Sequence, residues 1–150
     1  MTQAELKEQL KAAMKAKDAV RLNVVRSLLS AMTNEAVAKG KGPDGVLSND
    51  EVLTVLTRAS KQRKDSIEQF EKGGRPELAE AEKAEFSVIE SMLPAQMSRD
   101  EIVAATKAKA AELGVTDKTG VNKLMGMLMK DLKGRADGNA VKAVIDSLFA

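Results

Sequence analysis

Apolar residues recur along this chain at three- and four-residue spacing, which places them on one face of an α-helix. The first stripe consists of Leu6, Leu10 and Met14, and a second runs from Leu22 to Ala36. No five-residue segment alternates apolar and polar positions with β-branched enrichment. The pattern therefore predicts helices and no sheet.

Three of the predicted helices begin with a capping box, in which a Ser or Thr and a Glu three residues later cap each other's free backbone N–H groups. The three pairs are Thr2/Glu5, Ser48/Glu51 and Ser98/Glu101. Asp18 is expected to cap a further helix that carries the second apolar stripe. Helices are thus predicted to start near residues 3, 19, 49 and 99.

Glycine and proline mark the predicted helix ends. The Gly40 to Gly45 segment ends the second helix, and Gly73-Gly74 ends a long third helix that starts near residue 49. Pro76 suits the first turn of a fourth helix because a proline lacks the N–H that would go unbonded there. The short connection predicts that the third and fourth helices form an antiparallel hairpin.

A domain boundary is predicted at residues 94–97, where Leu93-Pro94 is followed at once by the capping box at Ser98. Three short helices are expected beyond it, at about 99–113, 120–133 and 138–149. The predicted fold is all-α. A helical N-terminal domain of about four helices occupies residues 1–93, and a small three-helix tail domain occupies residues 97–150.

The chain has no Cys and no His, which excludes thiolate nucleophiles, His-based triads and nearly all zinc sites. We therefore predict no catalytic residue, no metal and no cofactor. Disulfides are impossible, no apolar run approaches the roughly 20 residues that span a bilayer, and the N-terminus is amphipathic. These features predict a cytoplasmic protein without a membrane partner.

The net charge is only +2, but it is unevenly distributed. Residues 118–142 hold six Lys and Arg against two Asp. Positive side chains gain affinity for nucleic acids by releasing condensed counterions, and a glycine lets a backbone approach closely. The alternative is a solvated helix face with the glycine packed against another helix. The candidate residues are Lys123, Gly126, Lys130, Lys133 and Arg135.

A second basic group consists of Lys61, Arg63, Lys64 and Arg75. It could bind phosphate or carboxylate groups, but pairing with Glu82 and Glu85 across the predicted hairpin is favoured. Those two glutamates share a helix face and could also serve acid–base chemistry or a hard cation. No nucleophile or further ligands accompany them, so a structural ion-pair role is expected.

Several local patterns in this order resemble the YqeY family, whose fold also forms the C-terminal region of the B subunit of tRNA-dependent amidotransferases. The resemblance covers essentially the whole chain. It rests on Leu10, Met14-Lys15, Asp18, Arg21-Leu22, Arg26, Lys61-Gln62-Arg63, Ser66, Phe70, Gly74-Arg75, Leu78, Glu82, Glu85, Leu93-Pro94, Gln96, Ser98, Gly126, Met129-Lys130, Gly134, Asp137-Gly138 and Val141.

The resemblance implies an accessory module that grips tRNA for an amidotransferase or an aminoacyl-tRNA synthetase and performs no chemistry itself. The RNA-contacting residues would be the tail candidates above, with Lys61, Arg63 and Arg75 as a second group. One alternative is a protein-interaction module that docks on a translation-related enzyme. Another is a carbon–nitrogen ligase with glutamine as amido-N-donor, as the family label implies, although 150 residues leave no room for the amidotransferase catalytic domain.

Overall fold

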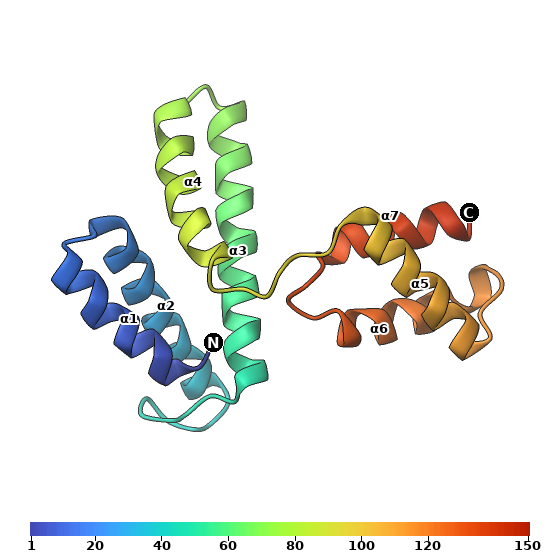
Figure 1. The fold of residues 1–150 in the computed structure, drawn as a ribbon, viewed down its shortest axis with the longest axis horizontal. Helices are drawn as coiled ribbons and strands as arrows, with labels where there is room; N and C mark the ends of the chain where they lie inside the picture. Colours follow the sequence, from blue (N-terminus) through green and yellow to red (C-terminus); the bar gives the residue numbers. More distant parts are fainter. The chain divides into compact units, whose positions relative to one another are not determined.

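The computed structural model describes residues 1–150 and contains only helices, which confirms the predicted all-α fold (Figure 1). The chain divides into two compact units, unit 1 from Met1 to Leu93 and unit 2 from Pro94 to Ala150. Unit 1 contains α1 (Gln3–Ala16), α2 (Ala19–Ala38), α3 (Asn49–Lys72) and α4 (Pro76–Glu90). Unit 2 contains α5 (Arg99–Leu113), α6 (Val121–Asp131) and α7 (Gly138–Leu148), with the short 3-10 helix η1 (Lys118–Gly120) before α6. No helix is long and apolar enough to cross a membrane.

The three predicted capping boxes all form, at the starts of α1, α3 and α5. In each box the Ser or Thr side chain accepts the N–H of the glutamate, and the glutamate carboxylate accepts the N–H of the capping residue. Asp18 likewise caps α2 by accepting the N–H of Arg21 at 3.0 Å. These helix starts are fixed by contacts within four residues, which is why the sequence predicts them.

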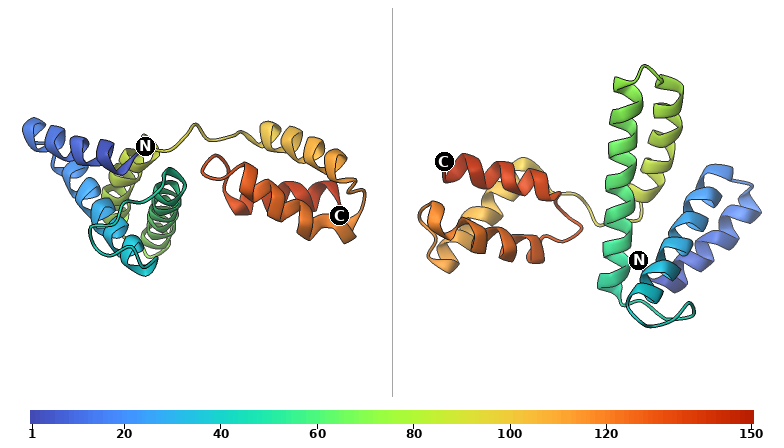
Figure 2. Two further views of the ribbon diagram at one scale, coloured as in Figure 1. Left: turned by 90° about the horizontal axis from the view of Figure 1, so that it is seen from below. Right: turned by 180° about the vertical axis from the view of Figure 1, so that it is seen from behind.

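Unit 1 is built from two antiparallel helix pairs, α1 with α2 and α3 with α4, and α2 packs against both α3 and α4 (Figure 2). Its core lies where the pairs meet, around Leu28, Met32, Val52, Leu56 and Ile89. The predicted stripe of α2 faces this core. Met14, expected on the inward stripe of α1, is instead 55% exposed, and Ala13 is buried. Each four-residue step turns by about 40° beyond a full circle, so two steps carry Met14 away from the face of Leu6, whereas Ala13 stays on it.

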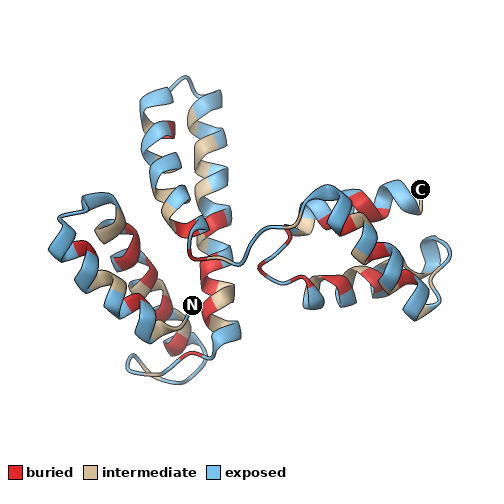
Figure 3. Cartoon of the chain, in the orientation of Figure 1, coloured by how far each residue is buried: buried red, intermediate tan, exposed pale blue.

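The α3–α4 hairpin extends beyond this core. Buried residues of α3 end at Ser60 (Figure 3), and between there and the turn the two helices pack mainly on each other. The turn is a Schellman motif, in which Gly74 adopts a positive φ of 70° and the N–H of Arg75 bonds the carbonyl of Phe70 at 2.8 Å. The sequence predicted both the glycine stop and the hairpin.

Unit 2 is a small bundle in which α5, α6 and α7 each contact the other two. Leu124, Leu128, Val141 and Ile145 form its centre. Two hydrogen bonds hold the end of the segment that joins the units. The N–H of Met97 bonds the carbonyl of Arg135 at 2.8 Å, and the Gln96 side-chain amide donates to the carbonyl of Gly134 at 2.7 Å. Residues 96 and 97 are therefore fixed to unit 2.

The contacts of this joining segment and of the 39–48 loop predict where a protease cuts. We expect limited proteolysis to cleave first between residues 40 and 46, where Gly40 and Gly42 have positive φ and few side chains pack. The second cut should fall near Pro94 and Ala95, ahead of the anchored Gln96. Mass spectrometry of the fragments measures this, and a first cut within α3 would contradict the proposed domain division.

Glu51 makes the stability of unit 1 depend on pH. The Lys41 ammonium, at 2.6 Å, and then the Ser48 N–H, at 2.7 Å, lower the pKa of Glu51 from 4.5 to about 2. A lowered folded-state pKa contributes stability above the unfolded pKa and loses it as the pH falls toward the folded one. Urea unfolding of Glu51→Gln should therefore show lower stability than wild type at pH 7, with the two curves converging between pH 4.5 and 2. A constant difference across that range would contradict the assignment.

Candidate nucleic-acid interface

The basic residues of the α3–α4 hairpin are largely bound to carboxylates of the same hairpin. The Arg63 guanidinium reaches Glu82 at 2.9 Å through Nη1 and Glu85 at 2.8 Å through Nη2. All three side chains are about three-quarters buried. The internal pairing favoured from the sequence is thus present for Arg63, and it occupies both glutamates that had been considered for acid–base or cation chemistry.

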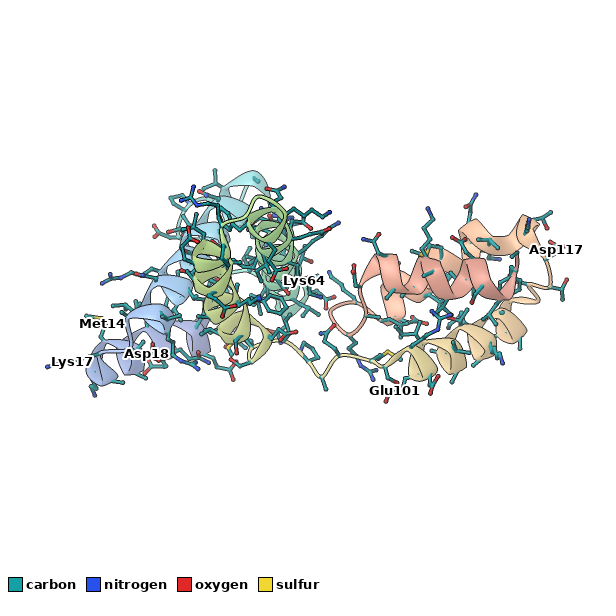
Figure 4. The ribbon with its side chains drawn as sticks, turned by 90° about the horizontal axis from the view of Figure 1, so that it is seen from above. Met14, Lys17, Asp18, Lys64, Glu101 and Asp117 are labelled. Atoms are coloured by element: carbon teal, nitrogen blue, oxygen red, sulfur yellow. The ribbon has the colours of Figure 1, made fainter.

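The other three bases of that group differ from Arg63. Arg75 pairs with Glu77 in its own turn, at 2.8 Å, and not across the hairpin. Lys64 lies over the ring of Phe86, with Nζ 5.5 Å from the ring centre, and Figure 4 marks its position on α3. Lys61 is exposed and forms no ion pair. The structure therefore does not gather these four bases into one free cationic surface.

The tail candidates on α6 lie on one exposed face. Lys123 and Lys130 are seven residues apart and so nearly eclipse each other along the helix, with Gly126 and Met127 within about 60° of them. All four are exposed, while Leu124 and Leu128 face the core. Lys133 and Arg135 follow on the turn after α6 and are also exposed. We call these residues the tail basic surface: Lys123, Gly126, Met127, Lys130, Lys133 and Arg135.

Gly126 lies in the interior of α6 with open space around it. A Cβ atom built on this residue would meet no heavy atom within 4 Å outside the helix's own backbone. The alternative considered from the sequence, that Gly126 packs against another helix, is therefore wrong. A glycine in a helix interior lowers stability by roughly 0.5–1 kcal/mol relative to alanine. No contact within unit 2 requires a glycine at this position.

The turn that carries Lys133 and Arg135 is held in place through hydrogen bonds to its backbone carbonyls. Gly134 adopts a positive φ of 76°, and the carbonyls of Gly134 and Arg135 accept the hydrogen bonds from Gln96 and Met97. The Arg135 charge reaches the start of α5, where Glu101 lies (Figure 4). The pKa of Glu101 is lowered first by the Ser98 N–H and hydroxyl and, to a smaller extent, by Arg135.

The two units differ in how many of their basic side chains form ion pairs. Of the nine Lys and Arg residues in unit 2, only Lys109 forms an ion pair, with Asp131 at 2.8 Å and Glu112 at 3.1 Å. In unit 1, nine of the fifteen Lys and Arg residues do so. Eight of the nine basic side chains in unit 2 are thus without an ion pair, against six of the fifteen in unit 1.

Met127 is the residue of this surface that sequence reasoning missed. The neighbouring Met125 and Met129 pack on the core of unit 2. Met127 is 37% exposed. The position of Met127, four residues from Lys123 and three from Lys130, already places it on their face.

Comparison with known proteins decides the family. The family model for Yqey-like proteins matches residues 3–149. The chain belongs to the YqeY-like family. The resemblance inferred from the sequence is therefore confirmed, and the all-α, two-unit structure described above is that of a YqeY-like chain.

Curated relatives of this YqeY-like chain carry the name "Altered inheritance of mitochondria protein 41, mitochondrial". The relative from Lachancea thermotolerans is 42% identical over 60% of this chain and 46% of its own length. That from Saccharomyces cerevisiae strain YJM789 is 34% identical over 81% of this chain and 66% of its own length. That from Kluyveromyces lactis is 33% identical over 97% of this chain and 80% of its own length. The chain thus spans about half to four-fifths of these relatives.

These names overturn the prediction of a cytoplasmic location, because each of the three relatives is named as mitochondrial. The prediction rested on the absence of cysteine, of an apolar run and of a secretory signal pattern. None of these features distinguishes the cytoplasm from the interior of a mitochondrion, because organelle addresses are short segments that receptors read independently of the fold.

Proposed function

We propose that this YqeY-like chain is a tRNA-binding accessory module that contacts RNA through the tail basic surface and performs no chemistry itself. It would hold tRNA for an amidotransferase or an aminoacyl-tRNA synthetase. The observation that carries the proposal is Gly126, an open position between two exposed lysines in the interior of a helix. A helix that bears an unneeded glycine there can let another molecule come within van der Waals distance of its backbone.

The charges around Gly126 favour a polyanion as that molecule. Lys123 and Lys130 flank the glycine on the same face and form no ion pair, so no internal carboxylate must be displaced before a phosphate binds. Each phosphate that a lysine or arginine neutralises releases condensed counterions and so adds affinity. Two cations about two helical turns apart can follow successive phosphates of one backbone.

The scarcity of aromatic residues supports contact with the sugar-phosphate backbone rather than stacking on bases. The chain has no Trp or Tyr, and its three Phe residues are all partly buried. Proteins that bind unpaired bases commonly stack them on exposed aromatic rings. Structured RNA is recognised instead by its shape, its phosphates and its 2′-hydroxyl groups, which fits a folded RNA such as tRNA.

Gly126→Ala tests the proposal because it has opposite effects on folding and on binding. The variant should raise the free energy of unfolding of unit 2 by roughly 0.5–1 kcal/mol. It should also weaken tRNA binding about tenfold, which corresponds to roughly 1.4 kcal/mol, because the new methyl group occupies the space that the RNA backbone would enter. Urea unfolding and fluorescence anisotropy with labelled tRNA transcripts measure the two effects.

The matched control is Asn139→Ala, which raises helix propensity at an exposed residue in the first turn of α7 that is not part of the tail basic surface. It should stabilise unit 2 without changing tRNA affinity. If Gly126→Ala binds tRNA as tightly as wild type, no backbone approaches Gly126 and the proposed contact is wrong.

A further inference from the structure

The turn between α6 and α7 alternates buried and exposed residues. Leu132, Gly134 and Ala136 are buried, and Lys133 and Arg135 between them are exposed. The N–H groups of Arg135 and Ala136 both bond the carbonyl of Leu132, at 2.9 and 3.1 Å. The carbonyls of Gly134 and Arg135, in contrast, accept their hydrogen bonds from residues 96 and 97. Two basic residues of the tail basic surface thus lie on a turn that depends on a segment outside it.

Gln96 is the side chain that connects this turn with the joining segment. Its amide nitrogen donates to the carbonyl of Gly134 at 2.7 Å and to the carbonyl of Pro94 at 3.1 Å. A side-chain amide has two N–H donors, so Gln96 uses both of them on backbone carbonyls. One uncharged side chain therefore ties the Gly134 turn to residues 94–96.

The residues on either side of this connection are anchored without Gln96. Met97 packs on the core of unit 2 and donates its N–H to the carbonyl of Arg135. Ser98 begins α5 with its own capping box, and Leu93 packs against the core of unit 1. Loss of the Gln96 amide would therefore loosen the turn while both cores keep their contacts.

A loosened turn would present its charges less well to a polyanion. Gly134 has a φ of 76°, and a glycine can also adopt negative φ at little cost, so the backbone alone does not fix the turn. Ordering a flexible segment during binding lowers affinity, whereas a segment that is already ordered avoids this loss. The positions of Lys133 and Arg135 are thus worth fixing before the ligand arrives.

Glu101 adds a second reason to fix Arg135. The two side chains form no ion pair, although Arg135 contributes to the lowered pKa of Glu101. The Glu101 carboxylate already accepts the N–H of Ser98 at 2.7 Å. A turn that moved could let Arg135 pair with this carboxylate, which would take one positive charge away from a phosphate.

We propose that Gln96 is a positioning residue for the tail basic surface and holds the Gly134 turn so that Lys133 and Arg135 reach RNA phosphates together. This inference rests on the proposed tRNA-binding function and adds to it a residue that acts through the turn without touching RNA. Coupling between two equilibria is reciprocal. Bound tRNA must therefore stabilise the hydrogen bonds between the joining segment and the turn.

Gln96→Met tests the proposal in the full chain, because methionine has a similar length and no N–H. Anisotropy with labelled tRNA transcripts should show binding about tenfold weaker than wild type. The slope of log affinity against log salt concentration should stay that of wild type, since every basic residue remains. The matched control is Gln69→Met, at an exposed glutamine of α3 whose side chain forms no hydrogen bond. It should bind tRNA like wild type.

Amide exchange separates positioning from a general loss of stability. In the absence of RNA, Gln96→Met should speed exchange of the Met97 N–H, which bonds the turn, and leave the core amides of Leu128 and Ile145 unchanged. In the wild type, saturating tRNA should slow exchange at Met97. Faster exchange at all three amides would indicate a merely structural role and overturn the proposal.

Two insertions of identical length and composition test the connection itself. Gly-Gly between Ala95 and Gln96 lengthens the joining segment but leaves Gln96 beside the anchored Met97, so tRNA affinity should match wild type. The same insertion between Gln96 and Met97 separates the amide from its anchor and should weaken binding as Gln96→Met does. Equal affinities of the two insertion variants would contradict the proposed role of Gln96.

The remaining outcomes distinguish this inference from the proposed function. If Gln96→Met weakens binding without changing Met97 exchange, Gln96 contacts RNA directly and is not a positioning residue. If the wild type shows salt-dependent tRNA binding that Gln96→Met leaves intact, only the positioning role is wrong. If the wild-type chain shows no salt-dependent tRNA binding, the proposed function fails and this inference fails with it.

Discussion

Replacing Lys130 and Arg135 by alanine should make tRNA binding markedly less sensitive to salt. Each phosphate contact contributes a slope of about −0.7 to −0.9 to a plot of log affinity against log salt concentration. Removing two contacts therefore makes the slope less steep by roughly 1.4 to 1.8. Between about 50 and 200 mM salt, the double variant should lose about tenfold less affinity than wild type. Anisotropy titrations across that range measure the slope.

The control for this variant is Arg26→Ala with Lys61→Ala. These are also one arginine and one lysine, exposed and without ion pairs, but they lie on unit 1. Both double variants should melt close to wild type, since exposed charges contribute little to stability. If the unit 1 pair reduces the slope more, the RNA surface lies on unit 1. If neither pair matters, the tRNA proposal fails and the docking-module alternative remains.

Arg63→Ala should destabilise unit 1 by about 2–3 kcal/mol. The guanidinium bonds Glu82 and Glu85 in a setting where all three side chains are about three-quarters buried. Its removal leaves two like charges that are partly desolvated and have lost their donor. Urea unfolding followed by NMR peaks of unit 1 measures the loss.

Replacing the whole Arg63 cluster by neutral residues shows whether the stability loss of Arg63→Ala comes from the unpaired glutamate charges. The triple variant Arg63→Met, Glu82→Gln and Glu85→Gln removes all three charges, so it should recover most of the lost stability. Lys72→Ala, which breaks an exposed pair with Glu68, should change stability by less than about 0.5 kcal/mol. A loss for Arg63→Ala no larger than that of Lys72→Ala would show that the Arg63 cluster contributes little.

The helices could be predicted because their ends are local. Ser48 and Glu51 lie in one turn, and Gly74 needs only its own left-handed conformation. The pairing of Arg63 was also foreseeable, since a short antiparallel hairpin places Glu82 and Glu85 opposite it. The pairing of Arg75 could not be predicted, because a flexible side chain at a turn can reach several nearby carboxylates. It pairs with Glu77, two residues away.

The surroundings of Gly126 could not be predicted from the sequence. A glycine in an amphipathic helix is equally consistent with close packing and with open space, and only the positions of α5 and α7 decide between them.

The α3–α4 hairpin beyond Ser60 has a thermodynamic consequence. Apolar exposure raises the heat capacity of unfolding, and in this part of unit 1 only Ala79 is a fully buried apolar residue, with Ile67, Phe70, Leu78 and Phe86 partly buried. Local opening of its tip would therefore have a small heat-capacity change and a low free energy. Amide hydrogens there would exchange through that opening long before those of the core, so the hairpin can change shape at its tip while its base stays folded.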